Sequence, residues 1–304
     1  MSRPVYSDPA TEYQIATSEV GVVAPPLHRL VWVMGPDAVE FLQGILSQDL
    51  TGDPVARTFL LEPTGRVVSV GWVLVGADRV GLAVDGAMAE TVAEKLGHYK
   101  IRVKADISVD HRPGYELWGP ESTEVIDRGW VERDGVVEAA IPLPGLARVL
   151  VVGDDPPAHL PRLGSDVVTA VRVEAGEPLP SRDFDEAVLP HETGLVGEAV
   201  SFTKGCFLGY ELVERVEARG AHSPRRLMGL AVTRNVIPPE GAEVWAGDRR
   251  VGRMTSVVES WGVGAPIGLV LARRGTEPGD EVEVRWQGGS APAVVRPLPM
   301  RPSL

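Results

Sequence analysis

The last quarter of the chain is the part whose sequence most restricts the fold. From residue 226 onward, short runs rich in Val and Leu alternate with Gly, Pro and Asp, beginning with LMGLAV and ending with APAVVRP. Short strands separated by turn residues at this spacing are typical of a small antiparallel barrel or sandwich. We therefore predict a β-rich domain over residues 226–304 and a separate α+β domain over residues 1–225.

The first domain mixes helical and strand periodicities. Alternating or continuous apolar residues predict strands over 28–34, 59–75 (two strands around a Pro-Thr-Gly turn), 79–85 and 101–109. Apolar residues at helical spacing predict helices after Asp37 and Asp85, over 165–175, and from Cys206 to about residue 219. Residues 1 to about 20 read as a loose polar arm.

Composition excludes several classes of protein. The chain has 30 basic and 42 acidic residues and a net charge of −12, which disfavours direct nucleic-acid binding. A single cysteine, Cys206, excludes an intrachain disulfide and a zinc site or cluster built from several thiolates of one chain. The six His show no metal-binding spacing, so no metal site is expected. No run is long and apolar enough for a membrane span or a signal peptide, so we expect a cytoplasmic protein without membrane partners.

Lys204, Gly205 and Cys206 form the first candidate site. Lys204 is the only lysine outside residues 95–104 in a chain whose other basic residues are Arg. If Cys206 begins a helix, the helix dipole and the Lys204 ammonium would both favour its thiolate, and the backbone at Gly205 could face an anion. The alternative is a small buried cysteine after an ordinary turn glycine.

Two further segments are candidates. Arg172 and Glu174 are followed by four further acids, Asp183, Asp185, Glu186 and Glu192. These carboxylates could accept hydrogen bonds from an amino-pyrimidine ring, although a solvated acidic loop explains the same composition. Residues 65–69 (GRVVS) could form a pocket-lining strand after a glycine turn, or an ordinary hairpin strand.

These segments resemble a known family. KGCFLGYE is similar to the Lys-Gly-Cys signature of the folate-binding YgfZ family, which shares its fold with the glycine-cleavage T-protein, an aminomethyltransferase. The resemblance continues, in order, through VMGPDAVEFLQGILSQDL, LEPTGRVVS, LGHYKIRVKADIS, VRVEAGEPLPSRDFDEAVLPHETGL and VGRMTSVVESWGVGAPIGLV. Together these motifs cover most of residues 28–300.

The resemblance implies packed α+β subdomains around a central channel, followed by a C-terminal antiparallel β-barrel. It implies tetrahydrofolate or a derivative in that channel, near the Glu174 helix and the Lys204–Cys206 loop. The implied ligand-binding residues are Arg172, Glu174, Asp183, Lys204, Gly205 and Tyr210, with Cys206 as the functional thiol. Tyr210 stands where the family signature has Gln, and a phenol cannot offer an amide's paired donor and acceptor.

Three departures from the T-protein pattern favour the YgfZ branch. Val68 and Ser69 occupy the positions of the T-protein Asp pair, no Tyr follows Tyr210, and T-proteins lack the Lys-Gly-Cys motif. We therefore expect a folate-binding accessory protein of iron–sulfur cluster assembly or repair, whose partners are iron–sulfur proteins or their assembly machinery, including enzymes that modify tRNA. The alternatives are a folate-dependent aminomethyl or one-carbon transferase, and an interaction scaffold that has lost folate.

Overall fold

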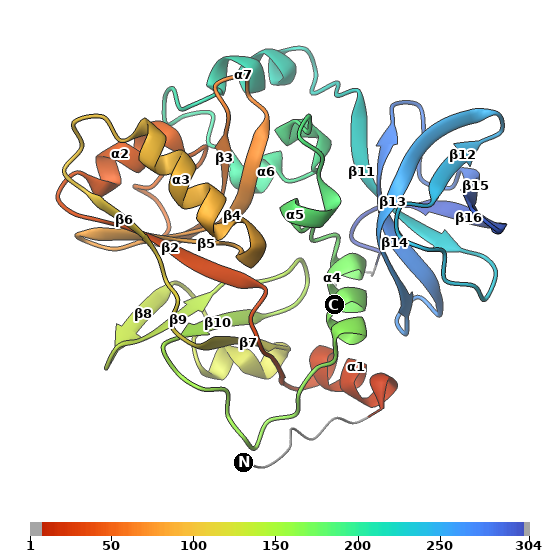
Figure 1. Ribbon diagram of the computed structural model, residues 1–304, viewed down its shortest axis with the longest axis horizontal. Coiled ribbons are helices and arrows are strands. Elements are labelled where there is room, and N and C mark those ends of the chain that lie inside the picture. Colours follow the sequence, from red (N-terminus) through yellow and green to blue (C-terminus); the bar gives the residue numbers. More distant parts are fainter. Residues whose placement is uncertain (1–7, 301–304) are drawn as a thin grey trace.

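Two antiparallel β-sheets form the N-terminal half of the computed structural model, which describes residues 8–300 (Figure 1). The first sheet has the strand order β3-β4-β5-β2-β6: β2 (His28–Met34), β3 (Val55–Leu61), β4 (Val67–Val75), β5 (Arg79–Asp85) and β6 (Asp106–Val109). The second has the order β1-β7-β10-β9-β8: β1 (Gly21–Val23), β7 (Gly114–Trp118), β8 (Trp130–Arg133), β9 (Val136–Ala140) and β10 (Arg148–Val152). Apolar side chains of both sheets, among them Trp32, Leu74, Ile141 and Leu150, share one core, so the sheets pack face to face.

Helices cover the other face of the first sheet. Helices α2 (Ala38–Ile45) and α3 (Ala89–Tyr99) bury Leu42, Val92 and Leu96 against it. Their apolar residues recur at helical spacing, which is why the sequence forms helices that are apolar on one side. The short 3-10 turns η1 (Gly86–Met88) and η2 (Pro120–Glu124) follow strands β5 and β7.

Residues 225–296 close into an antiparallel barrel. Its strands are hydrogen-bonded in the order β11-β14-β13-β12-β15-β16, with β16 returning to β11. They are β11 (Arg225–Val232), β12 (Glu243–Ala246), β13 (Arg249–Ser260), β14 (Ala265–Arg273), β15 (Glu281–Trp286) and β16 (Gly289–Arg296). Closure leaves no exposed sheet edge, and the interior is filled by side chains such as Leu230, Met254 and Val284. The antiparallel barrel expected for the C-terminal residues is confirmed.

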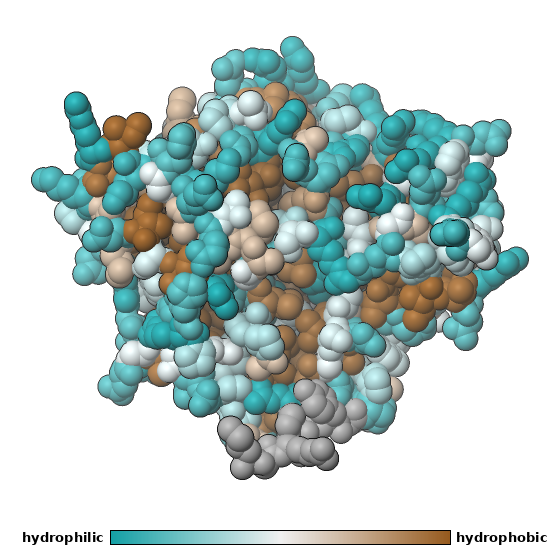
Figure 2. Space-filling model, in the orientation of Figure 1, coloured by the Kyte–Doolittle hydropathy of each residue, from teal (hydrophilic) through white to brown (hydrophobic). Residues whose placement is uncertain are grey.

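Helix α4 (Ser165–Ala175) lies between the sheets and the barrel (Figure 1). It packs on β13 and β14 on one side and on helix α1 (Pro9–Ser18) on another. Gly176 ends the helix at a φ of +76°, a left-handed conformation that favours glycine. In the same view, hydrophobic side chains run down the middle of the molecule between its two parts, framed by hydrophilic ones (Figure 2).

The segment between α4 and the barrel contains only short elements. They are α5 (Pro180–Asp183), η3 (Pro190–Glu192), α6 (Val196–Ala199) and α7 (Tyr210–Ala218). Their apolar side chains, including Val188, Phe207 and Val213, join Phe59 of the first sheet and Leu269 of the barrel in a single core. This long aperiodic stretch therefore fills the space between the two parts of the molecule.

Two sequence predictions need correction. The polar arm contains helix α1, because Asp8 accepts hydrogen bonds from the backbone N–H groups of Ala10 and Thr11 and because Tyr13 and Ala16 are buried; residues 1–7 lie outside the described part. The strand predicted over 101–109 begins only at Asp106. The predicted mixed α+β class is confirmed.

The start of that strand is displaced by a turn. Arg102 has a φ of +59°, and the backbone N–H of Lys104 donates to the Asp37 carboxylate at 2.7 Å. These constraints hold residues 101–105 out of the extended conformation.

Candidate functional site

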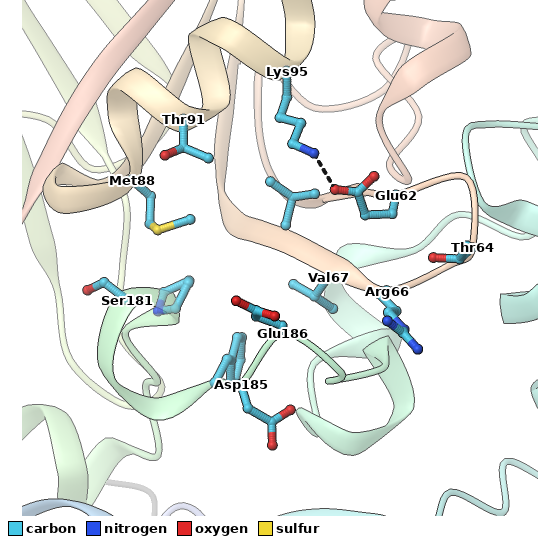
Figure 3. A pocket seen from close by; sticks show the side chains of 13 residues that line it. Glu62, Thr64, Arg66, Val67, Met88, Thr91, Lys95, Ser181, Asp185 and Glu186 are labelled. Atoms are coloured by element: carbon cyan, nitrogen blue, oxygen red, sulfur yellow. Dashed lines mark hydrogen bonds and ion pairs between the residues drawn. The ribbon is translucent and has the colours of Figure 1, made fainter.

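A cavity of about 690 Å³ opens between the first sheet, helix α3 and the segment after α5 (Figure 3). This volume is in the range of sites for small molecules. The lining side chains come from three separate parts of the chain: Glu62, Thr64, Arg66, Val67 and Val68; Met88, Thr91 and Lys95; and Pro180, Ser181, Phe184, Asp185 and Glu186. The segment GRVVS was a candidate pocket wall, and its Arg66, Val67 and Val68 are in this position.

The turn that forms one wall is held by close backbone packing. Gly65 donates its N–H to the Glu62 carbonyl at 2.8 Å, which closes the turn between β3 and β4. Gly209, just before α7, approaches this turn so closely that a Cβ there would lie 2.7 Å from the Glu62 carbonyl oxygen, and its φ is +80°. Glycine at 209 thus lets the Lys204–Gly209 loop abut the turn that lines the cavity.

The opposite wall is fixed by Asp85 at the end of β5. Its carboxylate accepts hydrogen bonds from the backbone N–H and the hydroxyl of Ser181 at 3.0 and 2.5 Å, and from the N–H of Ala87. One buried carboxylate therefore connects the start of α5 to the turn before α3, the two segments that carry Phe184 and Met88 into the cavity.

The charges around the cavity are only partly neutralised. Lys95 donates to Glu62 at 2.5 Å, and this hydrogen bond raises the pKa of the Lys95 ammonium. Asp185 is paired with Arg225 of the barrel, and the hydrogen bond from Arg225 lowers the pKa of that carboxyl. Within residues 8–300, neither the Arg66 guanidinium nor the Glu186 carboxylate has an ion-pair or hydrogen-bond partner. Figure 3 shows Glu186 across the cavity from the Lys95–Glu62 pair.

Arg172 and Asp183 were predicted to bind the ligand, and the structure brings them together in a buried cluster. The Arg172 guanidinium donates to Asp183 at 2.8 Å and to Ser256 at 2.6 Å. Asp183 also accepts from Thr255 and Ser256 of strand β13, both at 2.6 Å. These contacts tie α4 and α5 to the barrel, and neither residue lines the 690 Å³ cavity.

Glu174 follows Arg172 by two residues on α4 and is fully buried. Its carboxylate accepts a hydrogen bond from the Tyr13 hydroxyl at 2.8 Å and another from Ser260. Burial raises the pKa of Glu174 to about 7, against the opposing effect of hydrogen bonds from Ser260 and the Gly262 backbone. Glu174 does not line the cavity. Its observed contacts join helices α1 and α4 to the barrel, and its pairing with an amino-pyrimidine remains a prediction.

Lys204 points its ammonium at backbone carbonyls. Its Nζ donates to the carbonyl oxygens of Leu46 at 2.7 Å and Gln48 at 2.8 Å, which anchors the Lys204–Gly209 loop to the end of α2. Burial lowers the pKa of Lys204 to about 8. The ammonium also lies 5.6 Å from the ring centre of Phe207, which packs edge-on against Tyr210.

The prediction that Cys206 begins a helix is wrong. Helix α7 begins at Tyr210, because Gly205 and Gly209 both adopt positive φ values of +98° and +80° and interrupt the helical conformation. The helix dipole therefore does not act directly on Cys206. The alternative of a buried cysteine is also wrong, because Cys206 is exposed to solvent. The loop presents a free thiol on the surface. It is Gly209, three residues later, that abuts the turn lining the cavity.

Four cavity residues have ordinary sequence contexts, and only the packing of distant segments brings them into the lining: Met88, Thr91, Lys95 and Phe184. Glu186 differs, because it belongs to the acidic segment that was a candidate source of carboxylates, and it does line the cavity. Within residues 8–300, no helix has the length and apolar character needed to cross a bilayer.

The barrel and the overall fold are both similar to those of known proteins. Residues 225–300 match the family described as the glycine cleavage T-protein C-terminal barrel domain. The crystal structure of the glycine cleavage system aminomethyltransferase T from Bartonella henselae superposes with a TM-score of 0.83 at 18% identity, over 97% of this chain and 90% of that one. The fold is therefore that of the T-proteins, as the sequence predicted.

Curated relatives extend the comparison to sequence. An aminomethyltransferase of Caldanaerobacter subterraneus is 26% identical, over 86% of this chain and 80% of the relative. The mitochondrial iron–sulfur cluster assembly factor IBA57 homolog of Pyricularia oryzae is 28% identical, over 83% of this chain and 72% of the relative. The chain is thus similar in sequence both to aminomethyltransferases and to iron–sulfur cluster assembly factors.

Proposed function

We propose that this protein binds a reduced folate in the 690 Å³ cavity and acts as an accessory protein in iron–sulfur cluster assembly or repair. The cavity supports the folate part of this proposal. It combines apolar side chains with an unpartnered carboxylate and an unpartnered guanidinium among the described residues. A reduced folate has the matching chemistry, because it joins an amino-pyrimidine to an apolar linker and an anionic glutamate.

The residues of the cavity fit this ligand. Glu186 would accept hydrogen bonds from the amino-pyrimidine, while Met88 and Phe184 would contact the ring system. Arg66 would pair with the carboxylates of the glutamate. When bound, tetrahydrofolate supplies one-carbon chemistry; the chain's own residues orient it and shield one of its faces from water.

The exposed Cys206 supports the assembly part of the proposal. A surface thiol on an anchored loop can supply one ligand to an iron–sulfur cluster that is passed to or from a partner, or can react with a partner's disulfide. The relatives named as iron–sulfur cluster assembly factors are consistent with this role.

A folate-dependent aminomethyltransferase is the second candidate. The presence of Glu186 in the cavity favours it, because a carboxylate beside the folate could act as an acid or base. Against it, Val68 lines the cavity where the T-protein pattern has an acid, and Ser69 is buried.

Calorimetric titration with monoglutamyl tetrahydrofolate tests the folate proposal. Glu186→Gln and Arg66→Gln should each weaken binding roughly tenfold to a hundredfold, the effect of losing one charge-assisted hydrogen bond. Glu121→Gln, an exposed change elsewhere, is the matched control. Absence of binding by the wild type at high micromolar concentration would contradict the proposal and favour the scaffold alternative.

Two further assays separate the candidate functions. Purified protein should not form methylene-tetrahydrofolate from an aminomethylated lipoyl carrier; rapid formation would establish the transferase instead. In cells that lack the protein, the wild type should restore the activity of an iron–sulfur enzyme and Cys206→Ser should not. Full restoration by Cys206→Ser would remove the thiol from the mechanism.

A further inference from the structure

The cavity wall that carries Glu186 is a short irregular segment between α5 and η3. Phe184, Asp185 and Glu186 line the 690 Å³ cavity from this segment, and residues 185–187 are exposed. Within residues 8–300, neither the backbone nor the side chain of Glu186 makes a hydrogen bond. The position of its carboxylate therefore depends on contacts made by its neighbours.

Close packing does not hold this wall from behind. A second cavity, of about 370 Å³, lies between the segment and the outer surface of the barrel. Phe184 and Asp185 line both cavities, so the same two residues separate two open spaces. In a close-packed interior, neighbouring atoms on every side would keep a side chain in place. Here another kind of contact must keep Phe184 and Glu186 at the first cavity.

A single guanidinium supplies that contact. Arg225, the first residue of β11, donates two hydrogen bonds to Asp185 and two to Glu192, the latter at 3.0 and 2.8 Å. The two carboxylates in turn hold the segment's backbone. Asp185 accepts from the Ala187 N–H at 3.0 Å, and Glu192 accepts from the Leu189 N–H at 3.0 Å. We call Arg225, Asp185 and Glu192 the arginine clamp.

The arginine clamp is better shielded than an ordinary surface ion pair. The side chain of Glu192 is 1% exposed and that of Arg225 is 23% exposed. The hydrogen bonds with Glu192 and Asp185 raise the pKa of Arg225. A planar guanidinium can bond two carboxylates at once through different N–H groups, whereas the ammonium of a lysine lacks this fixed geometry. The clamp therefore depends on arginine and not on positive charge alone.

Two fixed points orient Glu186. Asp185, immediately before it, is bonded by Arg225, and its carboxylate points away from the middle of the cavity (Figure 3). Two residues after Glu186, Val188 is fully buried, and its carbonyl accepts a hydrogen bond from the N–H of Val67 at 2.9 Å. Val67 belongs to β4 and lines the cavity. The clamp thus fixes one end of the wall, and β4 fixes the other.

We infer that Arg225 is a positioning residue for the ligand of the first cavity, because the arginine clamp holds Phe184 and Glu186 where they contact the ring system. This inference rests on the proposed function, since it assigns a residue that orients the same site. Arg225 lines the second cavity and not the first. It therefore acts through the segment and does not touch the ligand.

A double-mutant cycle tests the inference by calorimetry with monoglutamyl tetrahydrofolate. Arg225→Gln should weaken binding about tenfold or more. Glu186→Gln should weaken binding at least about tenfold in the wild type but less than about threefold in Arg225→Gln, because Glu186 is already displaced there. Arg66→Gln, on the opposite wall, should keep its full effect in both proteins. Effects of Arg225→Gln and Glu186→Gln that simply multiply would overturn the inference.

Three further variants separate the clamp from a general loss of stability. Glu192 lies outside both cavities, and Glu192→Gln keeps an oxygen for the Leu189 N–H while removing the charge, so it should weaken binding at least about threefold. This variant replaces Arg225→Gln if the latter does not fold. Arg225→Lys should recover only part of the affinity. Arg182→Gln breaks a different ion pair, between α5 and Glu240, and should bind like the wild type. An equal loss in Arg182→Gln would overturn the specific role of Arg225.

Hydrogen exchange measures the wall without a ligand. Backbone amides of residues 185–187 should exchange at least about tenfold faster in Arg225→Gln than in the wild type, while those of β4 should not change. If the wild type does not bind monoglutamyl tetrahydrofolate, the proposed function fails, and exchange alone then decides whether Arg225 positions the wall. Equal exchange in the two proteins would overturn the inference even where the folate binds.

Discussion

Glu174 holds a carboxylate at a position that solvent does not reach. Its hydrogen bonds from Tyr13 and Ser260 satisfy the oxygens, yet the surroundings still favour the protonated form, which is why its pKa is raised to about 7. An ordinary Glu has a pKa of about 4.5. Near neutral pH, ionisation of Glu174 therefore requires more free energy in the folded protein than in the unfolded chain.

This difference makes a prediction about stability and pH. Because the pKa is raised in the folded state, protonation of Glu174 adds to the free energy of unfolding. This contribution is fully present below pH 4.5 and is lost as the pH rises through 7. Glu174→Gln imitates the protonated form, so its stability relative to the wild type should increase by up to about 3 kcal/mol between pH 5 and pH 8. Urea unfolding at both pH values measures this; a constant difference between the proteins would contradict it.

Cys206 gives a second prediction at the scale of a residue. Because its side chain is exposed and is the chain's only thiol, one equivalent of iodoacetamide should label the native protein without denaturant. Mass spectrometry should find no label on Cys206→Ser. The free energy of unfolding of that variant should lie within about 0.5 kcal/mol of the wild-type value, as is usual for surface substitutions. Labelling that required denaturant would show that the loop closes over the thiol.

At the scale of elements, periodicity predicted regular segments well and their junctions poorly. Strand β2 and helix α4 lie where the apolar patterns predicted a strand over 28–34 and a helix over 165–175. The helix predicted from Cys206 starts four residues later because the backbone at Gly205 and Gly209 follows tertiary contacts, which no local pattern records. The candidate segment GRVVS does line the cavity, but its partners Met88 and Glu186 meet it only through packing of distant segments.

The Lys204–Gly209 loop shows how one side chain can hold an element. Lys204→Met would remove the ammonium that bonds the carbonyls of Leu46 and Gln48, leaving two polar groups with weaker solvation. We expect the free energy of unfolding to fall by about 1–3 kcal/mol and proteolysis within residues 201–209 to become faster. Lys104→Met, at an exposed position, is the control and should change neither the stability nor the proteolysis. Equal proteolysis of wild type and Lys204→Met would show that other contacts, such as the hydrogen bond from the Leu208 N–H to the Gly44 carbonyl, hold the loop without Lys204.

At the scale of the whole molecule, a buried charge network joins the two sheets and α4. Arg148 of β10 lies 3.6 Å from Glu177, which follows α4 and also pairs with Arg57 of β3. Glu116 of β7 bonds the ring of His28 of β2 at 2.9 Å. Burial alone would raise the pKa of Glu116, but His28 and Arg148 outweigh it and lower the pKa to about 2.

Because this network is buried, removing one positive charge leaves the remaining carboxylates less fully compensated. Arg148→Met should destabilise the protein by about 3–5 kcal/mol, because Glu116 and Glu177 lose the guanidinium charge that they share. Thermal and urea unfolding measure the loss of stability. The control Arg133→Met, on the exposed edge strand β8, should be almost as stable as the wild type. A loss below about 1 kcal/mol for Arg148→Met would show that the network contributes little net stability.

Helix α4 receives contacts from both ends of the described chain. Tyr13 of α1 bonds Glu174 near the end of α4, and the backbone N–H of Met300 donates to the Glu174 carbonyl at 2.7 Å. During synthesis, α1 must therefore wait for a partner made about 150 residues later, roughly 8–30 s at ordinary ribosomal rates. Val23 and Trp118 can cover its apolar side only in part before then, so a nascent chain of this protein should bind a holding chaperone.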